Sequence, residues 1–180
     1  ELYCAWYANS SAEAGEGSGA YVTISVSTDS GNVWRDNELI IAPIDPKDRI
    51  FEECLWRDPN GDVHLYWSRS KNGWWDGIGG VWECIIKYED GEYIRTSEPR
   101  MVMNKGIMLN KPIVIHGGDS ILYPQYVYNV PSSIQKGIAG AYVYMGKVGE
   151  KEEAPTSKGK IQIAPDTLNK HNASIEPYFL

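Results

Sequence analysis

Several side chains in this sequence have the chemistry needed to bind or cleave an acidic sugar. Guanidinium and ammonium groups pair with sugar carboxylates, and guanidinium does so in a bidentate geometry. Aromatic rings with a polar edge suit the faces of sugar rings. Cations lie beside carboxylates and aromatic residues in the longer polar segments. Among these carboxylates, Asp48 is a candidate catalytic acid and Asp76 is the alternative. The candidate substrate-binding residues are Arg49, Glu52, Arg69, Trp75, Lys111 and Tyr126.

Some of these candidates have a structural alternative. Asp48 and Arg49 fit an ion pair between neighbouring structural units as well as they fit a ligand contact. Glu52 and Glu53 are adjacent in a predicted strand, so their side chains lie on opposite faces and at most one serves a site. Trp75 lies in a glycine-rich loop, where its ring either stacks on a sugar or anchors the loop on its own unit.

His171 and Glu176 are the other two candidate catalytic residues. His171 precedes the last apolar run of the sequence and Glu176 opens it. Histidine changes its charge near neutral pH and therefore serves as an acid or a base. The other two histidines are expected to be structural, because His64 lies in the middle of a predicted strand and His116 in a tight turn.

The elements that position these residues are predicted to be β-strands. Helical periodicity is nearly absent, and short alternating runs are separated by Gly, Asp, Asn and Pro, a pattern typical of an antiparallel all-β protein. Asn-Gly, Asp-Gly and Gly-Gly turns join pairs of strands. We expect strands at residues 1–8, 20–27, 37–42, 50–57, 62–68, 80–88, 92–95, 99–103, 111–116, 120–128, 140–147, 160–164 and 174–180.

A strand, glycine turn, strand pattern recurs along the sequence. The segments "CLWRDPNGDVHLYWS" and "PIVIHGGDSILYPQYV" share it, and each is followed by a longer polar loop and a third strand. The repeat length is about 55 to 60 residues, a little more than the usual length of a propeller blade. Repeated units of four antiparallel strands indicate a β-propeller.

The octet "STDSGNVW", residues 27–34, fits the pattern Ser-x-Asp-x-Gly-x-x-Trp. In a tight turn, Ser27 and Asp29 are short acceptors for backbone N–H groups, and Gly31 allows a positive φ. We expect Trp34 to fold back under the turn and pack between two sheets, with its indole N–H available to an acceptor. These four residues are therefore expected to be structural.

This octet resembles the Asp box, or BNR repeat, of the sialidase superfamily, where it forms the turn between the third and fourth strands of a propeller blade. The segments "DRIFEECLWRDPNGDVHLYW", "GGVWECII", "NKPIVIHGGDSILYPQYV" and "IEPYFL" are similar to successive segments of bacterial sialidase-like proteins. The resemblance implies a six-bladed propeller or a seven-bladed relative, of which these residues are about half. It divides them into the end of one blade (1–45), two blades (46–104 and 105–168) and the start of a fourth (169–180).

In such a propeller the long loops lie at the end opposite the Asp box, and binding residues concentrate in loops. The resemblance implies a glycan-processing exo-glycosidase that acts on a terminal acidic sugar. Sialidases use a tyrosine nucleophile, a glutamate, an aspartate and three arginines, so they depart from the two-carboxylate pattern. The Arg-Ile-Pro signature of the first arginine is absent from this sequence. A non-catalytic carbohydrate-binding propeller and a polysaccharide lyase are therefore the alternatives.

Composition limits the other possibilities. The formal net charge of −7 argues against nucleic-acid binding, and no apolar run approaches the roughly 20 residues of a membrane-spanning helix. Cys4, Cys54 and Cys84 are expected to be buried free thiols, and we expect neither a metal nor a cofactor. The expected ligand is a glycan, and the resemblance implies an extracellular or periplasmic location. Open sheet edges would favour self-association.

Overall fold

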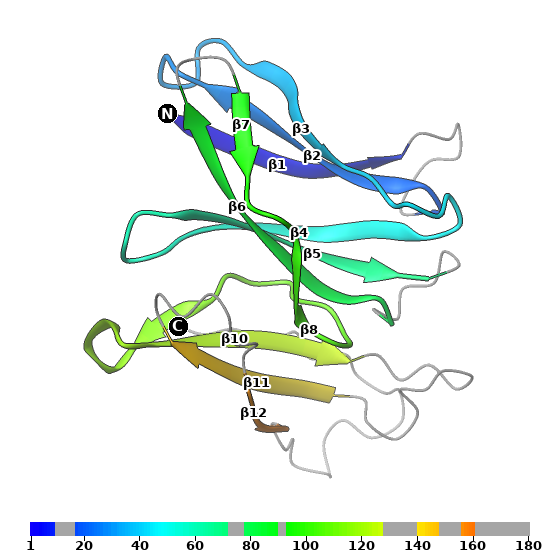
Figure 1. Cartoon of the computed structure of the whole chain (residues 1–180), viewed down its shortest axis with the longest axis vertical. Helices are drawn as coiled ribbons and strands as arrows, with labels where there is room; N and C mark the ends of the chain where they lie inside the picture. The colour runs from blue at the N-terminus through cyan, green and yellow to red at the C-terminus, as the bar shows by residue number, and fades with distance from the viewer. Residues whose placement is uncertain (10–16, 72–77, 90–92, 128–139, 148–155, 161–180) are drawn as a thin grey trace, which may run out of the picture.

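The structure is a computed structural model that describes residues 1–9, 17–71, 78–89, 93–127, 140–147 and 156–160. These residues form strands and one short 3₁₀ turn, which confirms the predicted all-β class (Figure 1). The elements are β1 (Leu2–Asn9), β2 (Ala20–Ser27), β3 (Arg35–Ile41), β4 (Arg49–Arg57), β5 (Val63–Ser70), β6 (Gly80–Glu89), β7 (Tyr93–Thr96), β8 (Arg100–Met103), β9 (Ile113–Ile115), η1 (His116–Gly118), β10 (Ser120–Val127), β11 (Gly140–Lys147) and β12 (Thr156–Lys160).

Most of the predicted strands are found within a few residues of their expected positions. A strand is observed at Thr156–Lys160, while most of the strand expected at 160–164 and all of the one expected at 174–180 lie outside the described residues. The described residues contain no candidate for a membrane-spanning helix.

The described strands form three antiparallel sheets that lie one above another in Figure 1. The first sheet has the order β1-β2-β3 and the third has the order β12-β11-β10-β9. The middle sheet has the order β4-β5-β6-β7, and β8 also pairs with β6. Strands that follow one another in the chain are therefore mostly neighbours in a sheet, as expected for antiparallel hairpins.

The stack of sheets has two different ends. At one, the turn end, lie the turn at residues 27–34, the turn at residues 58–62 and the start of β1. At the other, the loop end, β1, β5 and β10 finish and their partners β2, β6 and β11 begin, as the arrows of Figure 1 show. The predicted binding residues were expected at the loop end.

The middle sheet buries both of its faces. Leu65 and Trp67 of β5 point toward the first sheet and pack in one cluster with Ile24. Tyr66, between them in the chain, points the other way and packs in a second cluster with Tyr123 of the third sheet. Successive side chains of a strand alternate between faces, so this one strand supplies two cores. Each large apolar side chain buried in this way contributes roughly 1.5–3 kcal/mol.

The three cysteines are distributed over this stack. Cys54 packs in the cluster that faces the third sheet, and Cys84 packs in the cluster that faces the first sheet. Burial raises the pKa of the Cys54 thiol to about 11 and that of the Cys84 thiol to about 12. Cys4 is exposed. Its expected burial is wrong, because its neighbours Tyr3 and Ala5 take the face of β1 that packs on the middle sheet.

A buried ionic network lies on the face of the middle sheet that meets the third sheet. The Nδ1 atom of His64 contacts the Oε1 atom of Glu83, and its Nε2 atom lies 3.5 Å from an Asp58 carboxylate oxygen. Arg100 Nη2 and Nε lie 2.8 Å and 3.0 Å from the Oε2 atom of Glu83. The ring of His64 stacks on that of Tyr66, with centroids 5.9 Å apart. His64 therefore has the structural role that its place in the strand predicts.

Glu83 is the centre of this network. Burial raises the pKa of its carboxyl, but the hydrogen bond with His64 and the charge of Arg100 together lower that pKa by more. The net pKa of Glu83 is therefore below its usual value of 4.5. Its negative charge links β6, which carries it, to β5 and to β8.

Replacing Glu83 by glutamine is expected to lower the free energy of unfolding by about 3 kcal/mol at neutral pH, because the buried His64 and the partly exposed Arg100 lose the carboxylate that they bond. The folded-state pKa of Glu83 is depressed, so its contribution is present above pH 4.5 and is lost as the pH falls through the folded-state value. Urea unfolding at several pH values should therefore give a difference between wild type and variant that narrows on acidification. Glu98→Gln, at an exposed position, is the matched control. If both variants lost the same free energy of unfolding, the stabilising role of the ionic network around Glu83 would be refuted.

Candidate functional site

The turn at residues 27–34 is held by its own side chains. Ser27 Oγ donates to Asp29 Oδ1 (2.8 Å) and accepts the N–H of Gly31 (2.8 Å). Asp29 Oδ1 also accepts the N–H of Val33 (2.9 Å), and Gly31 has a φ of 91°. The bonds from Val33 and Ser27 lower the pKa of the Asp29 carboxyl. Because the acceptor oxygen of Asp29 is used within the turn, this residue forms structure and is not available for chemistry.

Trp34 does not lie where the pattern predicts. Its side chain is 39% exposed, and its indole N–H donates to the carbonyl oxygen of Gly31 at 3.1 Å. The expected packing of Trp34 between two sheets is therefore wrong. The cause is local, because a carbonyl three residues earlier satisfies the indole N–H at the surface of the turn.

At the loop end, Asp48 and Arg69 form an ion pair. Arg69 Nη2 and Nε lie 2.7 Å and 3.2 Å from Asp48 Oδ2. The Asp48 side chain is 7% exposed and that of Arg69 is 24% exposed. The carbonyl oxygen of Asp48 also accepts the N–H of Gly19 at 2.9 Å, which ties the segment before β2 to the start of β4. This ion pair joins Asp48 to a residue of β5 in the same sheet. The pair of Asp48 with Arg49 between structural units, which was the alternative in the sequence, stays a prediction.

Arg49 is shielded from solvent beside this pair. It opens β4, is 1% exposed, and places its guanidinium carbon 3.9 Å from the centroid of the Phe51 ring. A desolvated guanidinium over an aromatic face is favoured by about 2 kcal/mol. Arg49 is thus positioned firmly in the wall of the loop end.

Glu52 and Glu53 lie in a β-bulge. The register of β4 on β5 shifts between Phe51 and Cys54, and Glu52 has a φ of 51°, in the left-handed region. Burial raises the pKa of the Glu53 carboxyl, and its Oε2 atom is buried without a hydrogen-bond partner in the described structure. Bulges redirect side chains and are common beside active sites, and strained backbone is concentrated there as well. Two adjacent glutamates in a strand were the signal in the sequence.

Tyr126 is buried against the segment at residues 104–110. Its backbone N–H and carbonyl bond those of Ile107, at 2.9 Å and 2.8 Å. Gln125 donates from Nε2 to the carbonyl oxygen of Lys105. Gly106 has a φ of 75°, and a Cβ atom there would lie 2.5 Å from the Tyr126 carbonyl oxygen. This segment is therefore packed tightly on β10 at the loop end.

The structure brings together Asp48, Arg49, Arg69 and Glu52, which lie near the loop-end termini of β4 and β5. Tyr126 reaches the same end from β10. Trp75, Asp76, His171 and Glu176 lie outside the described residues.

Lys111 lies elsewhere, in the lining of a groove at the turn end, so its expected place at the loop end is wrong. The reason is the course of the chain. Ile107 is bonded to β10 at the loop end, and the following residues travel toward the turn end, where β9 begins.

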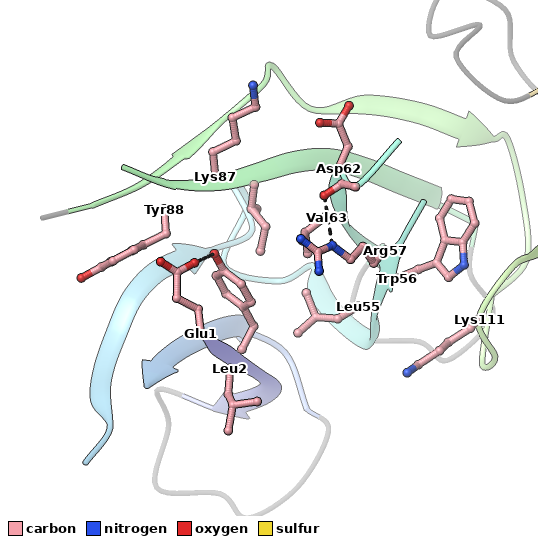
Figure 2. Close-up of a pocket in the computed structure, with 13 residues that line it drawn as sticks. Glu1, Leu2, Leu55, Trp56, Arg57, Asp62, Val63, Lys87, Tyr88 and Lys111 are labelled. Atoms are coloured by element: carbon pink, nitrogen blue, oxygen red, sulfur yellow. Dashed lines mark hydrogen bonds between the residues drawn. The ribbon is translucent and has the colours of Figure 1, made fainter. Parts of the chain in front are cut away.

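That groove has a volume of about 550 Å³ and opens between the first and middle sheets (Figure 2). Tyr3 donates its hydroxyl to Glu1 at 3.3 Å, and Arg57 donates from Nε to the carbonyl oxygen of Gly61 at 3.2 Å. Burial, followed by the Glu1 charge, raises the pKa of Tyr3 to about 12. The lining residues come from strand ends that are far apart in the chain, so no local pattern predicts this groove. They are Glu1, Leu2, Tyr3, Leu55, Trp56, Arg57, Gly61, Asp62, Val63, Ile86, Lys87, Tyr88 and Lys111.

Comparison with models of protein families, with curated proteins and with solved structures found no match for this chain. Within the described ranges, no group of three or more His, Cys, Asp or Glu side chains is arranged to hold a metal ion. The chemical groups that the structure describes at the loop end are the Asp48–Arg69 ion pair, the buried guanidinium of Arg49, and the two glutamates of the bulge, Glu52 and Glu53.

Replacing Gly106 by alanine is expected to destabilise the protein by about 2 kcal/mol or more, because the positive φ and the contact with the Tyr126 carbonyl both oppose a Cβ atom. Gly117→Ala is the matched control. Gly117 also has a positive φ, but a Cβ atom there meets nothing within 4 Å, so the variant reports backbone strain of about 1 kcal/mol. Urea unfolding measures both losses. Equal values would argue against the close approach of residues 104–110 to β10.

Proposed function

We propose that this chain is part of a sialidase-like β-propeller whose loop end binds and processes a terminal acidic sugar. Three antiparallel sheets stacked face to face support this proposal, as does the self-bonded turn at residues 27–34. One observation carries most of the weight. Two arginines, Arg49 and Arg69, lie with Asp48 at the end of the sheets opposite that turn.

In this proposal the more exposed guanidinium, that of Arg69, binds the sugar carboxylate, and Arg49 adds positive charge from behind it. An exo-glycosidase needs a proton donor for the oxygen of the bond that breaks, and water adds to the sugar carbon that is released. Glu53 is a candidate donor, because it lies in the bulge of β4, its Oε2 atom is buried without a hydrogen-bond partner in the described structure, and burial raises the pKa of its carboxyl. Asp48 remains the other candidate acid, and it orients Arg69 through their ion pair.

A non-catalytic carbohydrate-binding propeller is the second candidate. It is favoured by the burial of Asp48, which is 5% exposed and already bonded to Arg69. A carboxylate engaged in this way positions a binding residue more readily than it transfers a proton. The same fold with a lyase activity is a further outcome that the test below distinguishes.

The proposal is tested with the full-length protein. A fluorogenic sialoside measures hydrolysis, the absorbance of unsaturated uronates measures lyase activity, and a glycan array measures binding. We expect turnover of an acidic glycoside, with kcat/KM reduced at least tenfold in Arg69→Gln, a loss of about 1.4 kcal/mol of transition-state binding. Lys147→Gln, an exposed lysine at the turn end, is the control.

The outcomes separate the candidates. Binding to acidic glycans that depends on Arg69 but occurs without turnover would support the non-catalytic propeller. Turnover only in the absorbance assay would assign the lyase. Neither turnover nor binding of any acidic glycan by a folded protein would refute the proposal.

A further inference from the structure

Three cationic side chains line the groove at the turn end. Arg57, Lys87 and Lys111 line it, and within the described part of the chain no carboxylate lies at ion-pair distance from any of the three. The guanidinium of Arg57 uses its Nε on the Gly61 carbonyl, which fixes its direction and leaves its terminal nitrogens for a ligand. The carboxylate of Glu1 already accepts the hydroxyl of a neighbouring tyrosine.

The lining also contains the carboxylates of Glu1 and Asp62, together with apolar and aromatic side chains. Leu55, Val63 and Ile86 contribute aliphatic surface, and Tyr3 and Tyr88 contribute rings with polar edges. Figure 2 shows Leu55, Val63 and Tyr88 near Arg57, with Lys87 and Lys111 on either side of it. Such rings pack on the apolar faces of sugars, while cations bind acidic substituents. Cations spread along a groove fit repeated negative charges better than one anion.

We propose that this groove is a binding site for an acidic oligosaccharide, a short chain of sugar rings that carry carboxylates. Its volume of about 550 Å³ lies within the range of roughly 300–1,000 Å³ that is common for ligand sites. The protein has a net charge of −7, which repels polyanions in general. Binding therefore requires the local cations and the sugar rings together. This site is at the opposite end of the sheets from Asp48 and Arg69 and does not rest on the function proposed for them.

The test is titration of the protein with a hexamer of galacturonic acid, followed by calorimetry and by amide chemical shifts. The matched ligands are a neutral galactose hexamer and a hexamer of glutamic acid, which separate sugar recognition from charge alone. We expect binding of the acidic sugar only, with shift changes at Tyr3, Arg57 and Lys87. The double variant Arg57→Gln, Lys111→Gln should weaken binding at least tenfold. Lys47→Gln, an exposed lysine before β4, should leave it unchanged.

Thermal unfolding of each variant establishes that it is folded. If the double variant is unfolded, Lys87→Gln and Lys111→Gln are tested singly, because neither side chain donates a hydrogen bond that holds a described turn. Three results would overturn the proposal: no binding of the acidic sugar, equal binding of the glutamate hexamer, or binding that is insensitive to the folded groove variants. The loop-end assays are unaffected by any of these results.

Discussion

The middle sheet has to satisfy two hydrophobic cores at the same time. Its strands alternate residue by residue, with Leu65 and Trp67 directed to the first sheet and Tyr66 to the third. A shift of one residue in the pairing would exchange the two sets and expose both cores to the wrong neighbours. On the face toward the third sheet, the polar side chains of His64 and Glu83 are buried and bond each other. The face-to-face stack of the described sheets follows from this requirement.

Because both faces of the middle sheet are occupied, its accessible chemistry lies at its two ends. The loop end has Asp48 bonded to Arg69 and a bulge that redirects two glutamates. The turn end has the self-contained turn at residues 27–34 and a groove between the first and middle sheets. The packed sheets lie between these two ends, so each end is a separate surface of one scaffold.

The sequence was informative where structure depends on near neighbours. Strand positions and hairpin turns could be predicted, because alternation and turn residues such as Asn60 and Gly61 act over a few residues. The bonding partners that a side chain has on other strands could not be predicted. Asp48 forms an ion pair with Arg69 across the β4–β5 pair, and Glu83 forms one with Arg100 of β8, which pairs with β6. Lys111 was assigned to the wrong end for the same reason, since its position depends on the path of the chain after Ile107. The expected positions of Trp75, His171 and Glu176 remain predictions.

The two buried cysteines lie on opposite sides of the middle sheet, Cys54 toward the third sheet and Cys84 toward the first. A thiol with a raised pKa in a packed core reacts with an alkylating reagent only after its surroundings open. The rates at which the two sulfurs become modified therefore report separately on how often each neighbouring sheet lifts away. The chain thus contains a natural pair of probes for the order in which its layers come apart.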